Sequence, residues 1–147
     1  MKIEKKSLGW NKFENMDVEY RKPSNVDYET MCEKVKETVT SSGFAVLAEI
    51  PVSDILKSKG FSYTDMKTYD VCNASYASRA LALSTKFESL LPCHISIKRT
   101  ESGTEVIGQM PEFLARSAGF NPESKDADFI IEVQEKLIVL IDRLAGM

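Results

Sequence analysis

The segment CHISIKRTESGTEVIGQM (residues 93–110) contains two runs in which apolar side chains occupy every second position. The first run, Cys93 to Arg99, has Cys93, Ile95 and Ile97 on one face and His94, Ser96 and Lys98 on the other. The second run is Thr104 to Met110, and Glu101-Ser102-Gly103 between the two supplies a hairpin turn. A hairpin of two half-buried strands predicts an antiparallel sheet with one face packed on a core.

Further elements extend from this hairpin in both directions. A strand, Met66 to Cys72, and a short helix, Ala74 to Leu83 with Asn73 as its N-cap, precede it. Earlier in the chain we expect another strand, Phe44 to Ile50, and a short helical turn, Asp54 to Lys59. In that earlier strand, alternation places Phe44, Val46, Ala48 and Ile50 on one face and Ala45, Leu47 and Glu49 on the other.

The two ends of the chain complete the pattern. Alternation from Met16 predicts a first strand that Pro23 ends, followed by a helix from Tyr28 that Gly43 closes. Its cap is Ser24, Asn25 or Asp27. After Pro111 we expect a linker, then a last helix, Ala127 to Leu144, whose wide apolar stripe is typical of a helix lying on a sheet.

The predicted fold class is therefore α+β. Two layers are expected, an antiparallel sheet of about five strands with helices on one face, in the order strand-helix-four strands-helix, with a short helix between the third and fourth strands. Residues 1–15 are expected to be an N-terminal extension, and residues 16–147 a single α+β domain, since domains of ~100–150 residues are common.

Composition excludes several classes of protein. The net charge of −3 opposes general nucleic-acid binding, which needs a positive surface. The apolar runs are far shorter than the ~20 residues of a membrane helix. We expect no secretory signal, because no apolar stretch follows residues 1–6. Three cysteines without a disulfide-framework spacing fit a reducing compartment, so we expect a cytoplasmic location.

Four short signatures resemble one protein family. They are Gly43 to Ile50, Val71-Cys72-Asn73-Ala74, Leu91-Pro92-Cys93 and Met110-Pro111. In order and spacing they are similar to segments of the bacterial and archaeal family called domain of unknown function 302, over roughly residues 16–145. The resemblance implies a two-layer α+β fold of the TATA-binding-protein-like type and a homodimer, and it assigns no activity. Ala74 stands where the family usually has proline, a residue suited to a helix start.

Cys72 is the candidate thiol of the chain. It lies just before the predicted N-terminus of a helix, where a partial positive charge can stabilise a thiolate. The alternative is a small side chain that fills a tight turn, because free cysteine is often buried.

Cys93, His94 and Glu49 are possible helpers of Cys72. Alternation places Cys93 in the core and Cys72 on the other face, which opposes a simple pair, although antiparallel strands would bring the two residues near one another. His94, the only histidine, faces the same way as Glu49 and can equally be an exposed residue, and Glu49 can pair with Lys98. Cys72 and His94 are weak metal candidates, and no metal is expected because no CxxC or HxxxH spacing occurs.

Two functions remain open at this point. The first is a non-catalytic, ligand- or partner-binding accessory module, with Glu49, Cys72, Asn73, Cys93 and His94 as candidate binding residues. The second is a thiol-based redox, sulfur-carrier or metal-handling protein that uses Cys72 with Cys93 and His94. No cofactor is expected. The expected partners are a second copy of the chain and an unknown small ligand or protein, with neither nucleic acid nor membrane.

Overall fold

The computed structural model describes residues 18–146. Its elements, in chain order, are β1 (Glu19–Ser24), α1 (Tyr28–Ser41), β2 (Ala45–Ile50), α2 (Val52–Ser58), β3 (Met66–Cys72), α3 (Ala74–Leu83), α4 (Phe87–Leu90), β4 (Cys93–Thr100), β5 (Gly103–Gln109), α5 (Pro111–Ser117) and α6 (Phe129–Ala145). The N-terminal extension expected over residues 1–15 lies outside the described residues.

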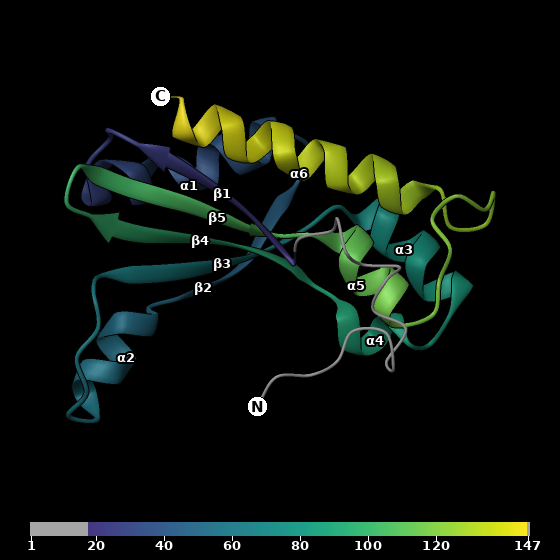
Figure 1. Ribbon diagram of the computed structural model, residues 1–147, viewed down its shortest axis with the longest axis horizontal. Coiled ribbons are helices and arrows are strands. Elements are labelled where there is room, and N and C mark those ends of the chain that lie inside the picture. Colours follow the sequence, from purple (N-terminus) through teal and green to yellow (C-terminus); the bar gives the residue numbers. More distant parts are fainter. Residues whose placement is uncertain (1–17, 147) are drawn as a thin grey trace, which may run out of the picture.

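A five-stranded sheet forms one layer of the domain, in the order β1-β5-β4-β3-β2. Every neighbouring pair is antiparallel, and the β4–β5 hairpin places Ser96 opposite Ile107. The α+β class and the antiparallel sheet predicted from the sequence are confirmed. Figure 1 shows α1 and α6 along one face of this sheet.

The main core lies between that face and the two long helices. From α1, Met31, Val35 and Val39 are fully buried, and from α6 so are Leu140, Ile141 and Leu144. They pack on Tyr69, Val71, Ile95, Ile97 and Val106 of the sheet. Each such side chain contributes about 1.5–3 kcal/mol through burial, so this layer holds the fold together.

The helix ends follow the capping signals of the sequence. Of the three candidate caps for α1, Asp27 is the one used, and its carboxylate accepts a hydrogen bond from Thr30 N at 3.2 Å. Gly43 has a φ of 88°, a left-handed conformation that glycine adopts without strain, and it ends this segment before β2.

Pro23 does not end the first strand, which corrects the expectation. β1 continues to Ser24, with Pro23 opposite Glu105 of β5. The physical reason is that β1 lies at the edge of the sheet, where a residue without an N–H can face away from its partner strand. Met16 and Asp17, where the strand was expected to start, lie outside the described residues.

The alternation predicted for β2 is also wrong after Val46. Val46 lies opposite Val71, but Ala48, and not Leu47, lies opposite Asp70, so Leu47 forms a bulge. The extra residue turns the rest of the strand over. Glu49 therefore shares the helix-covered face with its partner Tyr69, whereas it was expected on the face of His94.

Glu49 forms ion pairs on that face. Its carboxylate accepts a hydrogen bond from Lys67 at 2.9 Å and lies 3.3 Å from Lys36 of α1. The hydrogen bond from Lys67 lowers the pKa of Glu49, and Lys36 acts in the same direction. The pairing with Lys98 that was considered for Glu49 is replaced by these contacts.

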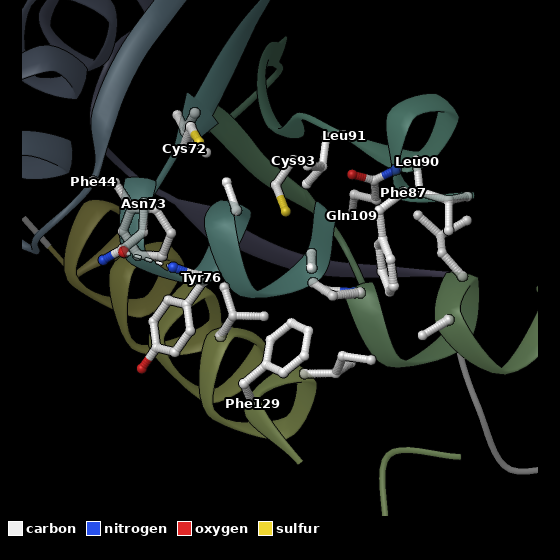
Figure 2. Close-up of a pocket in the computed structure, with 18 residues that line it drawn as sticks. Phe44, Cys72, Asn73, Tyr76, Phe87, Leu90, Leu91, Cys93, Gln109 and Phe129 are labelled. Atoms are coloured by element: carbon white, nitrogen blue, oxygen red, sulfur yellow. Dashed lines mark hydrogen bonds between the residues drawn. The ribbon is translucent and has the colours of Figure 1, made fainter. Parts of the chain in front are cut away.

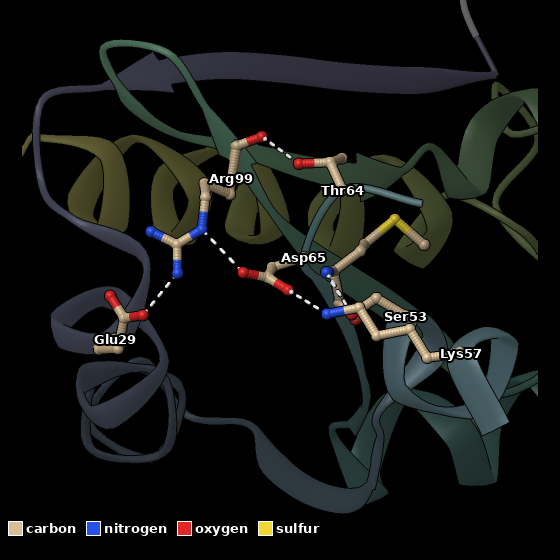
Figure 3. Close-up of polar contacts among 7 residues, drawn as sticks. Glu29, Ser53, Lys57, Thr64, Asp65 and Arg99 are labelled. Atoms are coloured by element: carbon tan, nitrogen blue, oxygen red, sulfur yellow. Dashed lines mark hydrogen bonds and ion pairs between the residues drawn. The ribbon is translucent and has the colours of Figure 1, made fainter. Parts of the chain in front are cut away.

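An arm formed by α2 and its flanking loops extends from β2 and β3 at one end of the sheet (Figure 1). Four charged side chains attach it to the sheet (Figure 3). Asp65 accepts a hydrogen bond from Arg99 Nε at 2.8 Å and lies 3.5 Å from Lys57, and Arg99 also pairs with Glu29 of α1. Ser53 adds a hydroxyl that accepts from Met66 N and donates to Met66 O.

The other end of the sheet carries three shorter helices, α3, α4 and α5. Only α3 was predicted. The segment Pro111–Ser117 was expected to be part of a linker, but it forms α5, with Pro111 in the first turn. Proline suits that position because its fixed φ is helical and its missing N–H would have no partner there. The described part of the chain contains no helix long and apolar enough to cross a membrane.

Candidate functional site

The ends of β3 and β4 meet the start of α3 at a tightly bonded turn. Cys72 is the last residue of β3, and Asn73 caps α3, as the sequence predicted. The Asn73 side-chain oxygen accepts hydrogen bonds from Ser75 N at 3.1 Å and Tyr76 N at 3.3 Å, while its nitrogen donates to Gly43 O at 3.0 Å. Asn73 therefore joins three segments and holds α3 against the sheet end.

A cavity of about 60 Å³ lies behind this turn, and Figure 2 shows the side chains around it. Three strands and four helices contribute to its walls, and nearly all of the lining is apolar. The lining residues are Phe44, Val71, Cys72, Asn73, Tyr76, Ala77, Ala80, Phe87, Leu90, Leu91, Cys93, Gln109, Pro111, Leu114, Ala115, Phe129, Ile130 and Val133.

A second, smaller core builds the far wall of the cavity. Phe87 of α4 stacks on Phe120 with ring centroids 4.7 Å apart and lies 6.4 Å from the ring of Phe129 in α6. Ala80 of α3 and Ala115 of α5 are buried in the same cluster. The small side chains of Ala80 and Ala115 take little space in this cluster, and the rings of Phe87 and Phe129 fill most of it.

Cys72 and Cys93 both line the cavity although they lie on opposite faces of the sheet. Cys93 is opposite Val71 in the β3–β4 pair, so it faces the helices, whereas Cys72 shares the other face with Asp70. This confirms the predicted faces. The two thiols reach one cavity because each stands at the last or first position of its strand, where the sheet stops and the helices close over both faces.

Burial changes the chemistry of Cys93. Desolvation raises the pKa of its thiol to about 11, and a negative charge on Cys72 acts in the same direction. Cys93 is therefore a neutral thiol at physiological pH, which makes it a weak hydrogen-bond donor and a poor nucleophile.

Gln109 brings a polar group to this apolar lining. It is the last residue of β5, and its side-chain oxygen is buried with no hydrogen-bond partner among the described residues. The nearby start of α5 does not use it, because the N–H of Glu112 donates instead to Gln134 of α6 at 2.9 Å. An acceptor buried without a partner costs about 1–3 kcal/mol of stability.

The structure brings some of the predicted site residues together and separates others. Cys72, Asn73 and Cys93 line the cavity. His94 is exposed on the face of the sheet opposite the long helices, across from Asp70, and Glu49 is bonded to two lysines; neither lines the cavity. Among residues 18–146, no group of three or more His, Cys, Asp or Glu side chains is placed to hold a metal ion.

Sequence reasoning missed most of the cavity wall. Gln109, Tyr76 and Phe129 belong to three elements that are far apart in the chain, and no local pattern links them. One signal was present for Gln109. It is a polar residue at the end of an apolar strand, just before the Met110-Pro111 pair that begins a helix.

Comparison with known proteins agrees with the fold. A crystal structure of an uncharacterised conserved DUF302 protein from Bacillus stearothermophilus superposes with a TM-score of 0.78 at 23% sequence identity, over 86% of this chain and 98% of that one. No curated protein matches the chain. The model of the family described as domain of unknown function DUF302 matches residues 20–144, and the chain therefore belongs to the DUF302 family.

Proposed function

We propose that this chain binds a small apolar molecule in the cavity between the sheet end and helices α3 to α6. The cavity of about 60 Å³, with its almost wholly apolar lining, carries this proposal. A water molecule needs roughly 10–15 Å³ of such space, so about four to six non-hydrogen atoms fit. Water itself suits the site poorly, because it requires two to four polar partners.

The thiol-based alternative has less support. Its three residues are Cys72, Cys93 and His94, and His94 is exposed away from the cavity. The pKa of Cys93, raised by burial to about 11, keeps that thiol protonated near neutral pH. These features favour a binding cavity with cysteines in its wall over a reactive pair assisted by a histidine.

Furan, a flat ring of five non-hydrogen atoms, is a suitable probe. Titration of the labelled protein with furan, followed by amide chemical shifts in NMR spectra, should give saturable changes at residues of the cavity wall. A ligand of five atoms gains at most about 1.5 kcal/mol per atom, or about 7.5 kcal/mol in all, so its dissociation constant should be no lower than about 3 μM.

Two variants of α3 separate cavity binding from surface binding. Ala77 lines the cavity, and Ala77→Leu fills part of it; Ala82 is exposed on the same helix and does not line it. Ala77→Leu should abolish the furan shifts, whereas Ala82→Leu should leave them unchanged. Absence of saturable shifts in the wild type, or shifts that survive in Ala77→Leu, would show that this cavity is not a binding site.

Association of two copies remains a prediction. Sedimentation velocity at several protein concentrations tests it directly. A cytoplasmic location likewise remains a prediction from the cysteine content.

A further inference from the structure

We infer that residues 85–91, the segment that contains α4, form the gate through which a ligand enters and leaves the cavity, and that Lys86 holds this gate closed. This inference rests on the proposed binding function and adds how access to the same cavity is controlled. The ligand is the one already proposed, a small apolar molecule.

The first step is the place of α4 in the cavity wall. Phe87, Leu90 and Leu91 line the cavity, and Figure 2 shows them along one side of it. Glu88 and Ser89, on the outer side of the same turn, are exposed. A single short helix therefore separates this side of the cavity from solvent, and an outward movement of that helix would open the cavity.

The second step is how the segment is attached. Its backbone N–H groups bond locally, from Phe87 N to Ser84 O, from Glu88 N to Thr85 O, from Ser89 N to Lys86 O and from Leu91 N to Phe87 O. Among the described residues, one hydrogen bond connects residues 85–91 to a segment beyond Ser84. In it Lys86 Nζ donates to Ala118 O, at the end of α5, at 3.2 Å. The same ammonium group lies 5.9 Å from the centroid of the Phe120 ring.

The other walls of the cavity are held more firmly. Its three strands belong to the hydrogen-bonded sheet, and Asn73 fixes the start of α3 to Gly43 O. Helices α5 and α6 are joined by Gln134, which accepts from Glu112 N at 2.9 Å and donates to the Glu112 carboxylate at 3.0 Å. Segments with few bonds to the rest of a domain open at the lowest free energy, so residues 85–91 should open before these walls do.

The third step is what opening breaks. Phe87 is buried and stacks on Phe120, so the open segment loses this contact as well as the bond from Lys86. Ser84 and Leu91, at the two ends of the segment, have an extended backbone, and rotation there can move α4 without unwinding α3. The closed state is therefore the major one, and it remains so when the bond from Lys86 alone is removed.

The variant Lys86→Met tests the gate through the kinetics of furan binding. One hydrogen bond of ordinary strength corresponds to about a three- to tenfold change in the open population. Entry and exit both pass through the open state, so the association and dissociation rates of furan should rise together by that factor. The dissociation constant should stay the same. Line-shape analysis of the NMR titration gives both rates.

Two further variants serve as controls for the loss of a lysine. Lys86→Arg keeps a cation and a hydrogen-bond donor, so it should restore slow exchange of furan. Lys34→Met removes an exposed lysine of α1, far from the cavity wall in the chain, and should leave both rates as in the wild type. Rates that rise equally in Lys34→Met would show that Lys86 has no special role.

Hydrogen exchange of the free protein tests the opening without any ligand. In Lys86→Met the amides of Phe87, Glu88, Ser89 and Leu91 should lose protection by the same factor by which the furan rates rise. The amides of α6 should keep their protection. Unchanged protection of residues 87–91 would mean that Lys86 does not hold the segment, and would overturn the inference.

The outcomes separate this inference from the proposed function. If furan does not bind, both fail. If furan binds and its rates are unchanged in Lys86→Met, the cavity is a binding site but the ligand does not pass through residues 85–91. If only the dissociation rate rises and the affinity falls, Lys86 stabilises the bound state and does not act on a gate, so the inference is wrong.

Discussion

Gly108 of β5 lies directly under Ile141 of α6, with no room between them for a side-chain carbon. A Cβ built on Gly108 would overlap Ile141 Cδ1 and lie 3.3 Å from its Cγ1. Ile141 is fully buried, so it cannot swing into solvent. The absence of a side chain at Gly108 therefore sets the distance at which α6 packs on the sheet.

Gly108→Ala should destabilise the protein by about 1–3 kcal/mol, because it overpacks this contact. Ile141→Val removes the overlapping Cδ1 atom and on its own should cost about 0.5–1.5 kcal/mol. The double variant should be more stable than the sum of the two effects predicts, which urea unfolding of all four proteins will measure.

The control combines Gly108→Ala with Val133→Ala, which lies more than two helical turns from Ile141 on α6, and these two losses should be additive. Additivity in the Ile141 pair would contradict the close contact.

Asn73 should contribute to stability through both ends of its amide. Asn73→Ala removes the cap of α3 and the bond to Gly43 O, and should cost about 1–2 kcal/mol. Asn73→Asp retains an oxygen acceptor for Ser75 N and Tyr76 N but loses the donor, so its loss should be intermediate. Urea denaturation of the three proteins gives the order. Equal losses for Ala and Asp would mean that only the bond to Gly43 matters.

The stability that the Asp65 ion pairs contribute at the α2 arm should depend on pH. Arg99 donates to Asp65 and holds the pKa of that carboxyl below its ordinary value of 3.8, and Lys57 adds to the effect. A carboxyl with a lowered pKa stabilises the fold above its unfolded pKa, and this contribution disappears as the pH falls through the folded value. The stabilisation is therefore complete near neutral pH and lost below 3.8.

The variant Asp65→Asn measures this contribution. It should lose less than about 1 kcal/mol at neutral pH, because the pair is partly exposed, and the difference from wild type should shrink as the pH falls below 3.8. Asp126→Asn, an exposed carboxylate outside this network, serves as the control. A stability difference that stays constant with pH would show that Asp65 acts through shape and not through charge.

Much of the fold could be predicted because local patterns and tertiary structure agree. The hairpin at residues 93–110, the Asn73 cap and the stripe of α6 each give one signal that no other part of the chain contradicts. The bulge at Leu47 could not be predicted from the sequence, because a bulge adds one residue to a strand without changing which residue types occur there. The prediction that Pro23 ends the first strand was wrong for a different reason. Whether proline ends a strand depends on whether that strand lies at the edge of the sheet, which the local sequence does not show.

The site was harder to predict than the fold. Cys72, Asn73 and Cys93, which line the cavity, could be predicted as site residues. Cys72 and Asn73 end one predicted strand and Cys93 starts the next, and an antiparallel pair brings these two strand ends together. His94 drew attention only as the single histidine, and the pleat that directs Cys93 into the cavity directs His94 away from it. Gln109 could not be distinguished from any exposed polar residue until the helices that bury its oxygen were placed.

Cysteine alkylation provides the last prediction. At neutral pH, Cys93 should react about 100-fold more slowly than a cysteine in an unfolded peptide, because its pKa is raised from 9.0 to about 11 and only the thiolate reacts. Cys32 should also react slowly, because desolvation raises its pKa. Peptide mass spectrometry after timed alkylation of the native protein gives a separate rate for each cysteine.

The pH dependence of that rate separates the two causes of slow reaction. If the pKa of Cys93 is raised, its rate should keep climbing tenfold per pH unit beyond 9.0 toward about 11, whereas simple shielding would lower the rate at every pH and leave the midpoint in place. Cys72→Ser should move the midpoint slightly downward, since it removes a charge that opposes ionisation of Cys93. Saturating furan should slow alkylation of Cys93 further if it occupies the cavity. Rapid labelling of Cys72 alone would instead favour the thiol-based activity, because a cysteine that only fills a wall has no reason to outpace an unfolded peptide.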